Sequence, residues 1–130
     1  MLTPTPTEWY LPMNEESYKA FVESLKKNGS EIIGGLTPET ADLMHMTWLL
    51  SGEAGELADA LKKYVIYRKP LDRENVIEEL GDIEFALSGI RSNLGITREE
   101  TITANVTKLS KRYHSGGYSD AQAQQRADKA

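Results

Sequence analysis

Two pairs of acidic residues have the types and the spacing to bind a metal ion. Glu53 and Glu56 are three residues apart, and so are Glu79 and Asp82. On a helix this spacing places both members of a pair on neighbouring turns of one face. Two such helices packed antiparallel would bring four carboxylates together, which is the oxygen-rich setting that a hard divalent cation prefers. The sequence therefore predicts that all four carboxylates converge on one or two divalent cations.

The apolar pattern places one member of each pair on a core-facing stripe. At about 100° per residue, Glu53 and Glu79 fall inside these stripes, while Glu56 and Asp82 lie at their edges. The stripes consist of Met46, Leu50, Leu57, Leu61 and Tyr64 and of Val76, Leu80, Ile83, Leu87, Ile90 and Leu94. A carboxylate facing a core is costly unless it is paired or bound to a metal. A solvated acidic face is the alternative, and two matched pairs favour metal binding.

The donor set favours Mg²⁺, with Mn²⁺ as the alternative. The chain has no cysteine, so neither a disulfide nor a thiolate zinc site can form. Its two histidines, His45 and His114, do not complete a Glu-x-x-His motif, which disfavours a ferritin-like di-iron site. A set of four candidate ligands that are all carboxylates suits magnesium or manganese.

Side chains that can meet a phosphate chain are also present. Lys63 falls on the Glu53 side of its helix, and Asn105, Lys108 and Arg112 share one face of the last predicted helix. No phosphate-binding loop of the G-x-x-x-x-G-K type occurs, so metal ions would have to lead any phosphate chemistry. We expect these four residues to bind substrate, and an ordinary solvated basic surface is the alternative.

Composition limits the class of protein. The 130 residues predict one domain, and the net charge of -5 argues against a nonspecific nucleic-acid surface. The N-terminus has no signal-like apolar run, and no stretch reaches the length of a membrane span. We therefore expect a cytoplasmic protein whose partners include neither a nucleic-acid polymer nor a membrane.

Helical periodicity and capping residues predict an all-α bundle, with a four-helix core that oligomerisation completes. The last helix is expected to bury a stripe that begins at Ile102. Gly52 and Gly55 suggest a break in the longest helix, and they serve either close ligand approach or tight helix packing. The predicted segments are an arm over 1–13, a domain over 14–113 with helices over 14–28, 38–68, 73–93 and 98–113, and a tail over 114–130.

Three segments together resemble the MazG-like nucleoside triphosphate pyrophosphohydrolases of the all-α NTP pyrophosphatase superfamily. They are 49–57 (LLSGEAGEL), 69–75 (KPLDREN) and 78–82 (EELGD). The later stretch 108–113 (KLSKRY) is similar to the C-terminal part of small single-domain members, including phage ones.

This resemblance implies a reaction and a ligand set. The family signature, Glu-Glu-x-x-Glu followed by Glu-x-x-Asp, implies that Glu53, Glu56, Glu79 and Asp82 are catalytic Mg²⁺ ligands. The implied reaction is hydrolysis between the α- and β-phosphates, which gives a nucleoside monophosphate and pyrophosphate. Gly52 stands where the signature has its first Glu. Relatives build the bundle from separate chains, which implies a homodimer or homotetramer.

Two alternatives stay open at the level of sequence. The same fold could act on dUTP, dCTP, phosphoribosyl-ATP or an alarmone such as ppGpp. A non-catalytic helical interaction protein with a structural cation site would also keep the acidic cluster.

Overall fold

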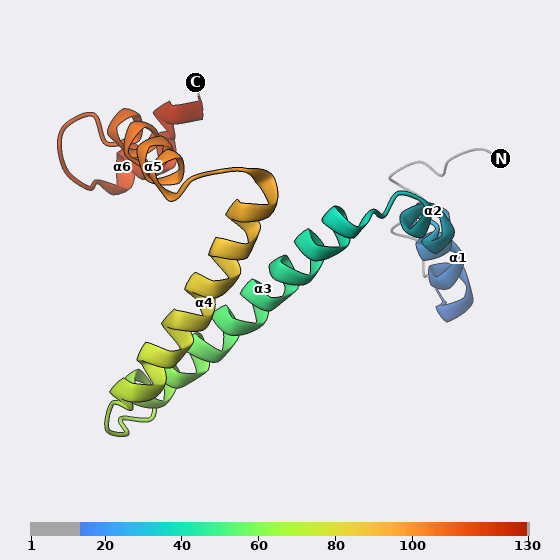
Figure 1. Cartoon of the computed structure of the whole chain (residues 1–130), viewed down its shortest axis with the longest axis horizontal. Helices are drawn as coiled ribbons and strands as arrows, with labels where there is room; N and C mark the ends of the chain where they lie inside the picture. Colours follow the sequence, from blue (N-terminus) through green and yellow to red (C-terminus); the bar gives the residue numbers. More distant parts are fainter. Residues whose placement is uncertain (1–13, 130) are drawn as a thin grey trace. The chain divides into compact units, whose positions relative to one another are not determined.

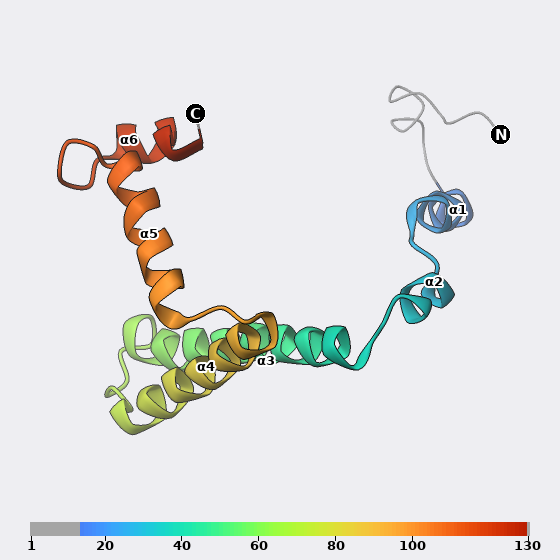
Figure 2. The ribbon, with the colours of Figure 1, turned by 45° about the horizontal axis from the view of Figure 1, so that its top comes forward.

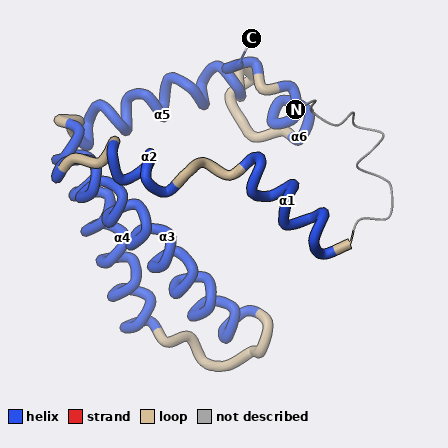
Figure 3. The backbone as a smooth tube through the Cα atoms, turned by 90° about the vertical axis from the view of Figure 1, so that its right-hand side faces the viewer, coloured by secondary structure: helices blue, strands red, loops and turns tan. Residues whose placement is uncertain are grey.

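The computed structural model describes residues 14–129, and all regular structure within them is helical (Figure 3). The all-α prediction is confirmed, while the expected arm over 1–13 lies outside the described residues. The elements are α1 (Glu15–Leu25), α2 (Gly29–Gly34), α3 (Pro38–Val65), α4 (Arg73–Leu94), α5 (Arg98–Arg112), α6 (Asp120–Gln125) and a short 3-10 helix, η2 (Ala127–Lys129).

The chain divides into two compact units, residues 1–36 and 37–130. The first holds α1 and α2, where the sequence predicted a single helix that stops at Gly29. The predicted helix is present but ends at Leu25, and Gly29, which was expected to stop it, is the first residue of a second helix. The Asn28 side chain accepts a hydrogen bond from the Ser30 backbone N–H at 2.7 Å, so it caps a new helix.

In the second unit, α3 is continuous from Pro38 to Val65. The break expected near Gly52 is absent, and the helix ends three residues before the predicted position 68. Thr37 and Thr40 form a reciprocal capping box at its start, with Pro38 in the first turn. A long unbroken helix therefore carries both Glu53 and its neighbouring glycines.

Helices α3 and α4 lie side by side as an antiparallel hairpin (Figures 1 and 2). Ala86 of α4 is fully buried between them. A Cβ placed on Gly89 would lie 2.6 Å from Met46 Sδ, so the helices approach closely there. Asn93 Nδ2 also donates to the Glu39 carbonyl at 2.9 Å. This packing fixes which residues of α3 face which residues of α4.

Helix α5 starts at a capping box, in which Thr97 and Glu100 satisfy each other's backbone N–H groups. Its apolar stripe was expected to be buried, and this prediction is wrong for the single chain. Ile102 is 44% exposed and Val106 is 58% exposed. The physical reason is that α5 packs mainly against η2 and α6, which do not cover this stripe.

The predicted tail folds back onto the end of α5. The Arg112 guanidinium donates to both Asp128 carboxylate oxygens, from Nε at 2.8 Å and from Nη2 at 3.1 Å. Gln122 Nε2 donates to the Ser115 hydroxyl at 2.8 Å. These contacts make residues 114–129 a packed extension of α5.

The described residues bury little apolar surface. Among them, Ala86 alone is fully buried, while Trp48 and Phe85 are each 65% exposed. No helix in the described part of the chain combines the length and apolarity that crossing a bilayer requires.

Candidate metal and substrate site

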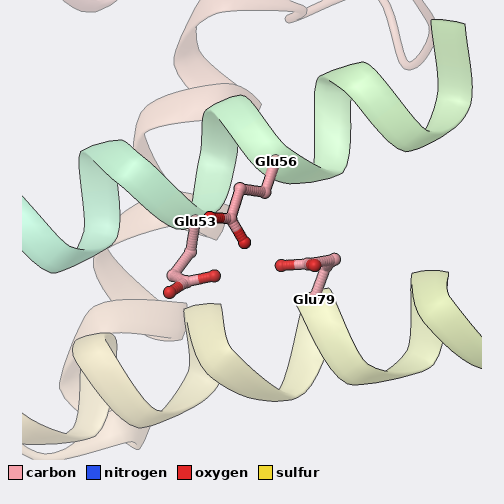
Figure 4. A group of neighbouring side chains, drawn as sticks. All are labelled: Glu53, Glu56 and Glu79. Carbon is pink, nitrogen blue, oxygen red and sulfur yellow. The ribbon is translucent and has the colours of Figure 1, made fainter.

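Three of the predicted carboxylates meet between α3 and α4. Glu53 and Glu56 extend from α3, and Glu79 extends toward them from α4 (Figure 4). One oxygen of each carboxylate lies within 4.8 Å of one oxygen of the other two. The antiparallel hairpin thus produces the convergence that the sequence spacing predicts for these three residues.

Two of these carboxylates have an unsatisfied oxygen. Glu53 Oε2 and Glu79 Oε2 are buried and have no hydrogen-bond partner among the described residues. A buried carboxylate oxygen without a partner is costly, and native structures rarely keep one unexplained. A divalent cation would satisfy both oxygens, and an all-carboxylate donor set suits Mg²⁺ or Mn²⁺. The residues present therefore fit the cation that the sequence predicts.

The crowding of carboxylates in the cluster changes the pKa of Glu79. Its pKa is raised from 4.5 to about 7, first by burial and then by the side chain of Glu53 on the facing helix. The negative charge of Glu56 also raises this pKa. Glu79 is thus partly protonated near neutral pH, and a bound cation would favour its charged form.

Asp82 is not part of this close group. The structure brings together three of the four predicted ligands, and Asp82 is exposed one turn further along α4. A residue three positions after Glu79 is rotated by about 60° around the helix, toward the edge of the buried stripe. Its role as a ligand stays a prediction.

A cavity of about 490 Å³ lies against the acidic cluster. Lys63, predicted to bind substrate, lies in its wall together with Glu56 and Glu79. Lys63 Nζ is 3.2 Å from Asp59 Oδ2, an ion pair between neighbouring turns of α3. The full lining is Gly52, Gly55, Glu56, Asp59, Ala60, Lys63, Asn75 and Glu79.

Sequence reasoning did not select Asn75 as a site residue. It lies one turn before Glu79 on α4 and lines the cavity. A lone asparagine near the start of a helix has no distinctive spacing. The available signal was its place at the end of segment 69–75, one of the segments that carry the family resemblance.

The three α5 residues predicted to bind substrate do not line this cavity. Asn105 and Lys108 are exposed. Arg112 is half-buried in the single chain, where its guanidinium pairs with Asp128. The substrate contacts of all three residues stay predictions.

Comparison with known families gives one finding. Residues 40–116, more than half of the chain, match the family model described as MazG nucleotide pyrophosphohydrolase domain. The matched range contains all of α4 and α5 and nearly all of α3. Comparisons with curated proteins and with solved structures gave no match.

Proposed function

The chain belongs to the MazG nucleotide pyrophosphohydrolase family, and on that basis we propose that it hydrolyses (d)NTPs between the α- and β-phosphates. Water and the triphosphate give a (d)NMP and pyrophosphate. One observation supports this most strongly: three carboxylates with two unpartnered oxygens lie beside a cavity that also holds a lysine. A polyanionic substrate with a divalent cation complements such a site.

Glu53, Glu56 and Glu79 would hold the cation, and Asp82 is the proposed fourth ligand. When bound, Mg²⁺ or Mn²⁺ neutralises phosphate charge and lowers the pKa of water. Without a metal the pKa of the Glu79 carboxyl is about 7, and a bound cation would hold this group in its charged form.

Lys63 has the charge and the position for the phosphate chain. Its ammonium lies in the cavity wall with Glu56 and Glu79. Lys63 also forms an ion pair with Asp59 on the same helix, at 3.2 Å between Nζ and Oδ2. Further substrate contacts are proposed for Asn105, Lys108 and Arg112. Arg112 would contact the substrate through the guanidinium N–H groups that do not bind Asp128.

The proposal includes a homodimer or homotetramer. Apolar side chains such as Ile102, Val106 and Phe85 are largely exposed in the single chain. A second copy would cover them and complete a helical bundle.

A panel of NTPs and dNTPs with Mg²⁺ tests the activity. We expect equal amounts of nucleoside monophosphate and pyrophosphate, and no products when EDTA replaces the metal. Release of orthophosphate would place the cleavage at another bond. No product from any nucleotide would favour the non-catalytic alternative.

A further inference from the structure

Gly52 and Gly55 line the cavity next to the acidic cluster. A Cβ added at either position would have no protein atom within 4 Å apart from its own helix backbone and chain neighbours. Gly89, in contrast, is held against Met46 Sδ. Tight helix packing in the single chain therefore explains Gly89 but neither of the cavity glycines.

Glycine inside a helix lowers stability relative to alanine, so two of them in one turn of a continuous helix call for another reason. A helix without side chains allows a ligand to approach the backbone closely. The open side of Gly52 and Gly55 is a cavity wall, which is where such an approach would occur.

The order of residues along α3 suggests which part of the substrate this is. Gly52 lies one turn before Glu56, and Lys63 lies about two turns after it. The cationic Lys63 is at the hairpin end where α4 begins, and it pairs there with Asp59. The glycine end lacks a cation among the cavity-lining residues. Phosphates are therefore favoured toward Lys63, and the uncharged part of the substrate toward the glycines.

We propose that Gly52 and Gly55 are specificity-determining residues that receive the nucleoside part of the substrate against the bare backbone of α3, while the β- and γ-phosphates extend toward Lys63. This inference rests on the proposed function. It assigns each end of the cavity to one end of a nucleoside triphosphate.

Alanine substitutions test this assignment, with Gly81→Ala as the matched control. Gly81 is also inside a helix, and a Cβ there also meets open space, but it does not line the cavity. All three variants should melt at higher temperature than the parent, because alanine favours helix over glycine. Gly52→Ala and Gly55→Ala should raise KM for nucleoside triphosphates roughly tenfold or more, the effect of one methyl group in a substrate pocket. Gly81→Ala should keep the parental KM.

Inorganic tripolyphosphate, which has no nucleoside, tests whether the glycines contact the nucleoside or the phosphates. Its inhibition constant against nucleotide hydrolysis should be unchanged in Gly52→Ala and Gly55→Ala, and it should rise in Lys63→Ala. A parental KM in both glycine variants would overturn the inference. An equal loss of tripolyphosphate binding, or a lower melting temperature with a changed oligomer mass, would also overturn it. If the parent chain releases no pyrophosphate from any nucleotide, the proposed function fails first and this inference fails with it.

Discussion

At the scale of single residues, the site depends on a carboxylate in an unfavourable place. Glu79 is half-buried, and one of its oxygens has no partner among the described residues. Glu53, on the facing helix, also has a buried oxygen without a partner among the described residues. A bound cation would remove both costs, which is why these residues point to metal chemistry more strongly than exposed acidic residues do.

Glu79→Gln should reduce turnover to background while the helical fold survives. The change removes a ligand charge, and the helix propensity of glutamine is close to that of glutamate. Pyrophosphate release at limiting Mg²⁺, with a circular dichroism melt, measures both effects. Glu78→Gln is the matched control, because Glu78 is exposed on the same helix. Parental activity of Glu79→Gln at limiting Mg²⁺ would remove Glu79 from the site.

The raised pKa of Glu79 predicts a pH dependence of metal-free stability. The folded chain keeps a proton on Glu79 up to about pH 7, whereas the unfolded chain releases it near pH 4.5. The folded state therefore binds more protons in this window, so its stability should fall as pH rises from 4.5 to 7. Melting in EDTA across this range should show the fall, and Glu79→Gln should flatten it. An identical slope in parent and variant would contradict the assignment.

At the scale of elements, the C-terminal fold-back changes what is expected of α5. Asp128 accepts two hydrogen bonds from Arg112, and these lower its pKa to about 2. Its contribution to stability is present above pH 3.8 and is lost as pH falls toward 2. Arg112→Ala should therefore lower the melting temperature and speed amide exchange in α6 and η2.

Lys108→Ala is the comparison for Arg112→Ala, because Lys108 is exposed on the same helix. It should weaken nucleotide turnover while changing stability by no more than about 0.5 kcal/mol. If both variants melt like the parent, the Arg112–Asp128 pair does not stabilise the chain. Unchanged kinetics in Lys108→Ala would remove that lysine from the substrate site.

The contact between α3 and α4 makes a separate prediction at Ala86. This side chain is fully buried, so Ala86→Leu should overpack the hairpin and cost about 1–3 kcal/mol of unfolding free energy. Ala58→Leu, at an exposed position of α3, should change stability by no more than about 0.5 kcal/mol. Urea titration of both variants measures the difference. Equal unfolding free energies would mean that the hairpin is not packed at Ala86.

Much of this element arrangement is predictable from sequence because its signals are local. The capping threonines Thr37 and Thr97 and the 3.6-residue period locate α3, α4 and α5. The start of α2 at Gly29 was missed because an Asn-Gly pair after a helix resembles a stop signal. The Arg112–Asp128 pair joins residues 16 apart, and no short-range pattern indicates it.

The site residues also divide into those with a local sequence signal and those without one. Glu53, Glu56 and Glu79 could be predicted because helix spacing and an apolar stripe place them together. Whether Asp82 joins them depends on side-chain direction at the edge of that stripe, which spacing alone does not determine. Sequence alone could not separate packing from ligand approach at Gly52, because the two differ in what lies opposite the residue and glycine has no side chain that indicates it.

At the scale of the whole molecule, the exposed apolar surface predicts self-association. Ala86 is the only residue classed as buried in the described range, whereas a domain of this length normally buries many apolar side chains. Phe85 is 65% exposed on α4 and Val106 is 58% exposed on α5. Apolar helix faces of this kind normally pack against another element.

Light scattering at micromolar concentration should therefore give two or four times the chain mass of 14.5 kDa. Phe85→Glu should shift the protein toward monomer and lower its melting temperature, because a charge cannot be buried in an apolar contact without a partner. Glu84→Lys, a charge change at the exposed neighbouring position, should leave the mass unchanged. A stable monomer of the parent chain would contradict the assembly and leave the apolar faces without a role. Activity that falls with dilution, in step with the loss of oligomer mass, would show that the α3–α4 site works only when a second copy supports the hairpin.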